Sequence, residues 1–132
     1  MPLETQIPRT AITSPELAPP VGPFSQAIEV GGFIYFSGQL GQEPTTGTLV
    51  AGGIAAETEH VFRNLSAVLK AAGRSFDDVV RAGVYLANMN DFVAMNGIYA
   101  KHFSQPFPAR TTIAVAALPL GACVEIDLVV KA

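Results

Sequence analysis

The sequence predicts an α+β domain in which one mixed β-sheet is packed by two helices. Two observations lead to this fold class. Short apolar segments alternate with longer segments of helical period, in the order strand, strand, helix, strand, helix, strand, strand. In addition, 132 residues supply one hydrophobic core and leave little room for a second. Helices set among strands in this order form a layer against a single sheet.

The first part of the chain predicts an arm and a β-hairpin. Residues 1–19 are rich in Pro, Thr and Ser, so we expect an extended N-terminal arm, with residues 20–132 as a single domain. Residues 24–30 and 33–40 have the composition of strands. The Gly-Gly pair between them can adopt positive φ at both positions, which suits a two-residue hairpin turn.

Two further segments have the apolar spacing of amphipathic helices. The first ends at the stop signal Gly73. Its buried stripe is Ile54, Val61, Leu65, Val68, Leu69 and Ala72. The second has Asn90 as its expected N-cap and is ended by Pro106 and Pro108. Its buried stripe is Phe92, Met95, Ile98, Tyr99 and Phe103.

Three more strands complete the predicted sheet. Ser75 and Asp78 resemble a short capped turn, which precedes a strand at residues 79–86. The last two strands are expected at residues 111–115 and 122–130. The loop AALPLGA joins them.

The composition predicts association between copies of the chain. Apolar residues make up 49% of the sequence and charged residues only 14%, which is more apolar surface than a small domain hides by itself. Another copy is the simplest cover for the outer face of the sheet, so we expect a homo-oligomer. No apolar run approaches the roughly 18 residues of a membrane span, so no membrane partner is expected.

The charged and sulfur-containing residues argue against several other classes of protein. The net charge is −3 and the eight basic residues are scattered, whereas a nucleic-acid groove needs a clustered basic face. The single cysteine, Cys123, excludes an internal disulfide, and because no export signal is visible we expect a cytoplasmic protein. Two histidines and one cysteine, far apart in sequence, make a poor metal site.

Arg110 is a charged residue at the start of a segment that otherwise looks buried. On a strand it shares a face with Thr112, and Glu125 shares a face with Asp127. We expect the last two strands to pair as a hairpin, with Arg110 opposite Asp127. The same register sets Thr112 opposite Glu125. The patch is then either a structural Arg110–Asp127 ion pair or a carboxylate-binding site that leaves Glu125 free for chemistry.

Three other features have simpler explanations than a functional site. The sequence GQLG at residues 38–41 lacks the Gly-Lys-Ser/Thr of a phosphate loop. His60 and His102 are expected to be ordinary surface or capping residues. Cys123 is expected to be a small apolar residue in a strand.

Five motifs, in this order, match one known family. They are GPFSQA at residues 22–27, YFSGQLG at 35–41, NDFVAMNGIY at 90–99, FPAR at 107–110 and ALPLGACVEID at 117–127. The chain therefore resembles the RidA family (also called YjgF or UK114), small deaminases of reactive intermediates. The resemblance runs from about residue 20 to residue 131.

The resemblance implies a chorismate-mutase-like α+β fold, assembled as a homotrimer with pockets in the clefts between subunits. It implies hydrolysis of 2-imino acids of the 2-iminobutanoate and 2-iminopropanoate type, and of enamines such as 2-aminoacrylate, to 2-keto acids and ammonia. It also implies that the partner is a small 2-imino or 2-keto acid, and that no metal or organic cofactor is required.

Carried onto the matching residues, the resemblance assigns two catalytic roles. Arg110 would bind the substrate carboxylate, and Glu125 would position and activate a water molecule. Backbone groups at Gly38 and Thr112 would hold the reacting end of the substrate. The pocket would also be lined by Ser37, Phe24, Asn96 and Pro119.

Two positions depart from the family pattern, and two other functions stay open. Residue 24 is Phe where Tyr is common, which removes a phenolic hydroxyl near the substrate. Residue 112 is Thr where bacterial members often have Cys, a mild change if the backbone plays the role. The first alternative function is a non-catalytic trimer that binds small carboxylates as a regulatory or chaperone-like module. The second is an endoribonuclease, against which the acidic charge balance counts.

Overall fold

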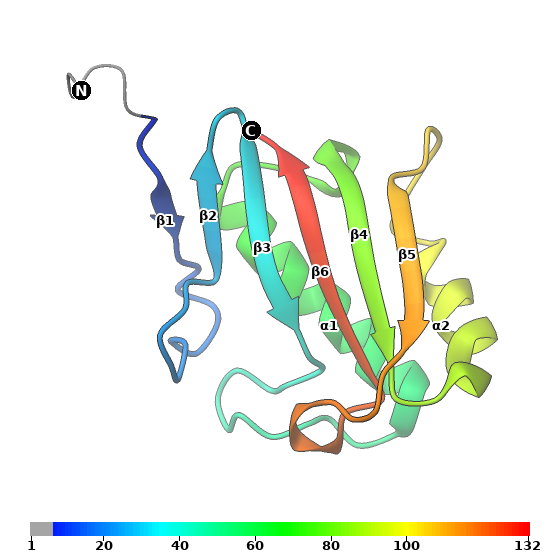
Figure 1. Ribbon diagram of the computed structural model, residues 1–132. Coiled ribbons are helices and arrows are strands. Elements are labelled where there is room, and N and C mark those ends of the chain that lie inside the picture. Colours follow the sequence, from blue (N-terminus) through cyan, green and yellow to red (C-terminus); the bar gives the residue numbers. More distant parts are fainter. Residues whose placement is uncertain (1–6) are drawn as a thin grey trace.

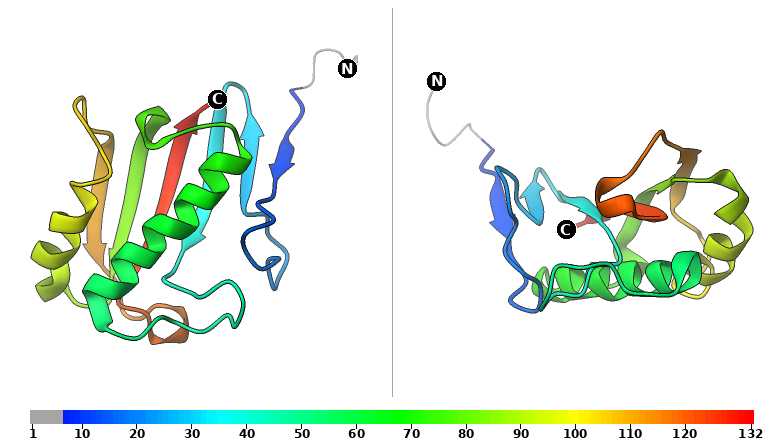
Figure 2. Two further views of the ribbon diagram at one scale, coloured as in Figure 1. Left: turned by 180° about the vertical axis from the view of Figure 1, so that it is seen from behind. Right: turned by 90° about the horizontal axis from the view of Figure 1, so that it is seen from below.

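A computed structural model describes residues 7–132 of the chain. It has one six-stranded β-sheet with two α-helices on one of its faces (Figure 1, Figure 2). The strands are β1 (Thr10–Ile12), β2 (Ala27–Val30), β3 (Phe33–Gln39), β4 (Val79–Leu86), β5 (Ala109–Ala114) and β6 (Val124–Lys131). The helices are α1 (Gly53–Ala71) and α2 (Phe92–Tyr99), with short 3-10 helices η2 (Phe76–Asp78), η3 (Met89–Asp91) and η4 (Pro119–Gly121).

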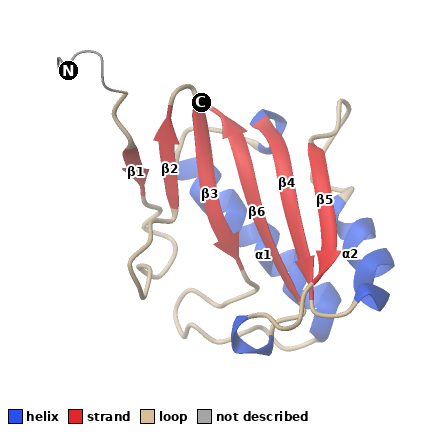
Figure 3. Ribbon diagram, viewed as in Figure 1, coloured by secondary structure: helices blue, strands red, loops and turns tan. Residues whose placement is uncertain are grey.

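The sheet is mixed, and its strand order is β1-β2-β3-β6-β4-β5 (Figure 3). Only β4 and β5 pair in parallel, through the crossover that contains α2, and the other neighbours are antiparallel. The predicted α+β class, with one mixed sheet and two helices, is confirmed. Part of the predicted arm adds an unpredicted edge strand, because Thr10–Ile12 pairs with β2. Residues 1–6 of that arm lie outside the described residues.

The hydrophobic core lies between the sheet and α1. Alternate residues of β6 face it, and Val124, Ile126, Leu128 and Val130 are each at most 2% exposed. Burying one side chain of this kind stabilises the fold by about 1.5–3 kcal/mol. The predicted stripe of α1 supplies the opposite side, and Gly73 follows the helix in the left-handed conformation, with φ 70°. Within residues 7–132, no helix is long and apolar enough to cross a membrane.

The predicted ends of the second helix are wrong, although its buried stripe packs in the core as expected. The side chain of Asn88, rather than Asn90, caps the first turn: it accepts a hydrogen bond from the N–H of Asn90 at 2.9 Å. This turn is the 3-10 helix η3, and α2 begins only at Phe92. The helix ends at Tyr99, well before Pro106, because the following residues form a turn.

The predicted hairpin between the last two strands is also wrong. β4 lies between β5 and β6, so neither the Arg110–Asp127 pair nor the Thr112–Glu125 pair forms. The physical reason is the crossover through α2, which brings β5 back parallel to β4 at the free edge of the sheet. The connection at residues 115–123 then passes through η4, below the lower ends of the strands in Figure 1, to reach β6.

Candidate active site

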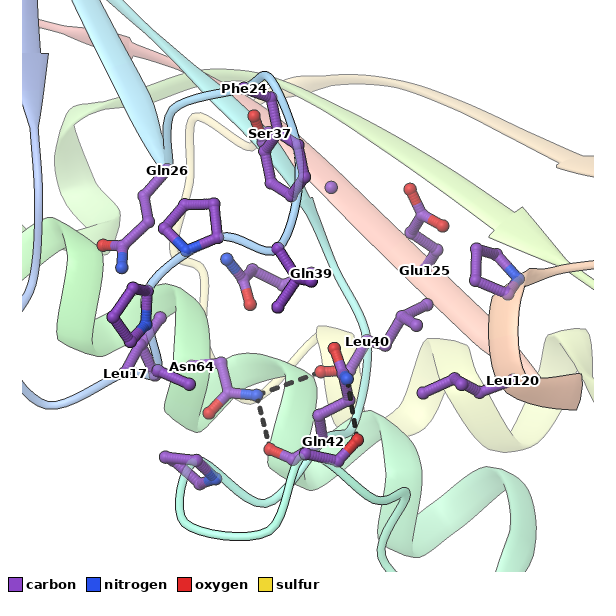
Figure 4. Close-up of a pocket in the computed structure, with 18 of the residues that line it drawn as sticks. Leu17, Phe24, Gln26, Ser37, Gln39, Leu40, Gln42, Asn64, Leu120 and Glu125 are labelled. Carbon is purple, nitrogen blue, oxygen red and sulfur yellow. Dashed lines mark hydrogen bonds between the residues drawn. The ribbon is translucent and has the colours of Figure 1, made fainter.

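A cavity of about 620 Å³ opens beside the lower ends of β3 and β6 (Figure 4). This volume is in the range of small-molecule sites. Its walls come from β3, β6, η4 and the segment before β2. Five of the predicted site residues line it, and we call them the glutamate cluster: Phe24, Ser37, Gly38, Pro119 and Glu125.

Gly38 lies at an irregularity of β3. The register of β3 against β6 shifts between Phe36 and Gln39, so β3 contains an extra residue there. Such β-bulges leave backbone groups unpaired and are frequent next to active sites. A Cβ on Gly38 would collide with Oε2 of Glu125 and lie 2.8 Å from its Cδ. Glycine is therefore required for the carboxylate of Glu125 to lie against the backbone of β3.

Ser37 fixes the opposite wall of the cavity. Its hydroxyl donates a hydrogen bond to the carbonyl of Ser25 at 2.6 Å, and its N–H donates to the carbonyl of Gln26 at 3.0 Å. These bonds hold the segment before β2 against β3. They place the ring of Phe24, a residue that is 57% exposed, at the mouth of the cavity. A half-exposed aromatic ring can pack against a ligand there.

Glu125 is the acid of this cavity. It is half-buried on β6, and the removal of water raises the pKa of its carboxyl above the ordinary value. The charge of Asp127, on the same face of β6, raises that pKa further. Asp127 itself accepts a hydrogen bond from the hydroxyl of Tyr85 at 3.0 Å. A carboxyl group with a raised pKa beside a cavity is suited to accept and return a proton.

Arg110 lies in a second place, which we call the arginine cluster and which consists of Asn96, Arg110 and Thr112. Nη1 of Arg110 donates to Oδ1 of Asn96 at 2.7 Å. The guanidinium lies over the ring of Tyr99, 4.6 Å from its centroid, and 5.6 Å from that of Phe92. The ion pairs within residues 7–132 do not include Arg110. The expected structural ion pair with Asp127 is therefore absent from this part of the chain.

Thr112 contributes to the arginine cluster through β5. The hydroxyl Oγ1 of Thr112 is buried without a hydrogen-bond partner in residues 7–132. The N–H of Val115 donates to the carbonyl of Leu86 on β4, at 2.9 Å. Backbone groups of successive residues point to opposite sides of a strand, so those of Thr112 point away from β4. They face the free edge, where no strand of residues 7–132 pairs.

Arg110 and Glu125 cannot contact one small substrate within a single chain. Arg110 pairs with Ala82 of β4, whose partner on β6 is Leu128, so Arg110 is two strands and three residues from Glu125. At the usual strand and residue spacings, their Cα atoms are about 14 Å apart. Their side chains also leave opposite faces of the sheet, since Arg110 packs on α2 and Glu125 lies on the face without helices.

Two aromatic residues under Arg110 were not predicted. Tyr99 was expected only in the core, but its ring also supports the guanidinium, and so does that of Phe92. The signal was present in the sequence: Phe92, Asn96 and Tyr99 are spaced four and three residues apart and share a helix face. Among the described residues, no three His, Cys, Asp or Glu side chains come together to hold a metal ion.

A comparison with protein families matches residues 15–132 to the family described as Endoribonuclease L-PSP. The chain belongs to this family. It is the RidA family that the five motifs indicated, and RidA from an Antarctic Psychrobacter species has a similar structure. That structure is 41% identical, with a TM-score of 0.87, and the match covers 93% of this chain and 99% of that one.

Other members of the RidA family carry a more specific description. The human 2-iminobutanoate/2-iminopropanoate deaminase is 45% identical over 121 residues, which cover 92% of this chain and 88% of the human protein. A protein of the same name from Dermatophagoides farinae is 42% identical, with 93% and 96% covered. The structure of E. coli TdcF with bound serine is 27% identical, with a TM-score of 0.85 and 93% and 98% covered.

Proposed function

We propose that the protein is a 2-iminobutanoate/2-iminopropanoate deaminase, which hydrolyses short 2-imino acids to 2-keto acids and ammonia. Relatives of that name, 45–46% identical over 92% of the chain, support the proposal. The structural observation that carries it is Glu125. This half-buried carboxyl with a raised pKa lies against Gly38 in a cavity of ligand size, and no ion pair within residues 7–132 involves it.

The reaction needs a positioned base more than it needs further activation of the imine carbon. A protonated imine is already electrophilic at C2. Glu125 accepts a proton from a water molecule as the water oxygen bonds to C2 and the C=N electron pair moves to nitrogen. Glu125 returns that proton to the nitrogen and accepts the hydroxyl proton as the C–N bond breaks. Ammonia leaves, the last proton passes to solvent, and the keto oxygen comes from water.

Arg110 performs the binding part of the reaction. Its planar guanidinium can donate two parallel hydrogen bonds to the substrate carboxylate. Asn96 and the ring of Tyr99 already hold it in place, so little side-chain freedom is lost on binding. The outward-facing backbone of Thr112, on the same strand, is available to the same ligand. Fixing the carboxylate also fixes the distance between C2 and the attacking water.

Because the two clusters lie on opposite faces of one sheet, we propose that two copies build each site. One copy supplies the glutamate cluster and its neighbour supplies the arginine cluster. The sheet face without helices carries Phe33, Tyr35 and Ile113, which are 41%, 49% and 44% exposed and which a neighbour would cover. A homotrimer with three such sites closes this head-to-tail arrangement. The cytoplasmic location stays a prediction.

The test is an assay in which an amino-acid oxidase generates 2-iminobutanoate and 2-iminopropanoate in place. We expect the protein to accelerate release of the 2-keto acids and to lower the amount of imine that semicarbazide traps. An unchanged rate at micromolar protein, with the substrate carboxylate still bound in a calorimeter, would favour the carboxylate-binding module instead. Cleavage of RNA by a preparation that does not hydrolyse imines would favour an endoribonuclease. That is the activity named in the family description.

A further inference from the structure

Glu57 of α1 is a buried acid that the proposed reaction does not use. It is only 5% exposed, and acids are rarely buried so deeply without a partner. Its partner is the backbone just before β6, because Oε1 of Glu57 accepts a hydrogen bond from the N–H of Cys123 at 2.8 Å. Glu125 follows two residues later. Glu57 therefore fixes the start of the strand that carries the proposed base.

Asn64 makes a matching connection two turns further along α1. It is 3% exposed, and its Nδ2 donates to the carbonyls of Leu40 and Gln42, both at 3.0 Å (Figure 4). Leu40 lies two residues after Gly38. Glu57 and Asn64 are seven residues apart and therefore lie on one face of α1. This face contacts both the start of β6 and the end of β3. The contact between Gly38 and Glu125 is thus fixed to α1 from both strands.

The helix and the chain after β3 are in direct backbone contact. A Cβ on Gly41 would lie 2.8 Å from both the Cα and the carbonyl oxygen of Glu57. Glu57 also influences the thiol of Cys123. Burial first, and then the neighbouring Glu57 carboxylate, raise the pKa of the thiol to about 11. The thiol therefore stays protonated at neutral pH and is not a nucleophile.

We propose that Glu57 is a positioning residue for Glu125: it fixes the start of β6 to α1, and so holds the Glu125 carboxylate against Gly38 at the place from which it activates water. The inference rests on the proposed deaminase function, because imine hydrolysis is its readout. The expected effect is large, since a displacement of about 1 Å at a reacting group can cost roughly 10²-fold in rate.

The first experiment compares Glu57→Ala with Glu57→Gln. Alanine removes the acceptor, and kcat for 2-iminobutanoate should fall about 10- to 100-fold while KM changes little, because the substrate carboxylate is bound by Arg110. Glutamine keeps an oxygen acceptor at the same reach, so kcat should return to within about threefold of wild type. Glu59→Ala is the matched control, because Glu59 is half-exposed on the same helix and pairs only at the surface, with Lys101 at 3.8 Å.

The deciding experiment places Glu57→Ala in a Glu125→Gln background. If Glu57 acts through Glu125, no carboxylate is left to position, and the second change should lower kcat by less than about twofold. Equal losses in both backgrounds, full activity of Glu57→Ala, or a glutamine variant as impaired as alanine would each overturn the proposal. Should Glu57→Ala not fold, Glu57→Asp takes its place in both backgrounds, because its shorter side chain does not reach the N–H of Cys123.

Wild-type activity in the same assay separates this proposal from the one on which it rests. If the wild-type protein hydrolyses the imine and the variants behave additively, the positioning role of Glu57 is refuted and the deaminase function stands. If the wild-type protein is inactive, the deaminase function is refuted, and the role of Glu57 in it is refuted as well.

Discussion

Glu125→Gln should slow hydrolysis of 2-iminobutanoate by about 10²- to 10⁴-fold, the usual effect of removing a general base. Glutamine keeps the shape that fits against Gly38, but its amide does not accept a proton from water. The loss should lie in kcat with little change in KM, because the substrate carboxylate is bound elsewhere. Steady-state kinetics with imine generated in place measure both constants. A variant as active as wild type would refute the role of Glu125.

The raised pKa of Glu125 gives this prediction a pH dependence. Only the ionised carboxylate accepts a proton, so wild-type kcat/KM should fall as the pH drops through a pKa above the ordinary glutamate value. Asp127→Asn removes the second cause of the shift and should move this acid limb to lower pH. A limb that stays in place in Asp127→Asn would show that another group controls it.

The same shift makes Glu125→Gln a clean variant to interpret. The folded protein favours the protonated form of Glu125. Ionising this carboxyl therefore lowers the stability of the fold, and the loss develops as the pH rises from the ordinary glutamate pKa through the raised one. Glutamine has no such cost, and the variant should melt no lower than wild type at pH 7. Lost activity in a folded variant then reports on chemistry.

Arg110→Ala should lower kcat/KM by about 10²- to 10³-fold, because two charge-assisted hydrogen bonds to the substrate carboxylate are lost. Here KM should rise as well, which distinguishes a binding residue from a base. Arg110→Lys should recover only part of the loss, since an ammonium group lacks the planar fork and the fit over the Tyr99 ring. The measurement is the same kinetic assay over a range of imine concentrations.

The control for Arg110→Ala is Arg63→Ala, which removes an exposed arginine from the outer side of α1. Its kcat/KM should stay within about twofold of wild type, since exposed charges away from a site contribute little. If both variants lose activity equally, the effect reflects overall charge. If neither does, the substrate carboxylate is bound by another group.

Both α-helices and five of the six strands were predictable because each has a local cause, whereas β1 was not predicted. Gly73 ends α1 through a left-handed backbone that glycine adopts without strain, and the alternation from Val124 to Val130 assigns one face of β6 to the core. Seven of the eight residues of the two clusters belong to the five motifs, Thr112 being the exception, and their roles in the site stay predictions. Local signals of this kind do not depend on how the strands are ordered.

The arrangement of the site could not be predicted because it depends on strand order. Residue spacing assigned Arg110 and Asp127 to faces of their own strands, but it did not say that β4 lies between those strands. With β4 inserted, the predicted single patch becomes two clusters on opposite faces. The bulge at Gly38 shifts the register by one residue, and only the glycine itself signals it in the sequence.

The two-copy site is tested most directly by mixing two inactive variants. Arg110→Ala and Glu125→Gln chains, produced together with different tags and purified as mixed oligomers, place an intact Arg110 beside an intact Glu125 at some interfaces. In a head-to-tail trimer of mixed composition one site in three is complete, so the purified mixture should regain about a third of wild-type activity. If each site were built within one chain, the mixture would remain as inactive as its two parents, and the proposed shared site would be contradicted.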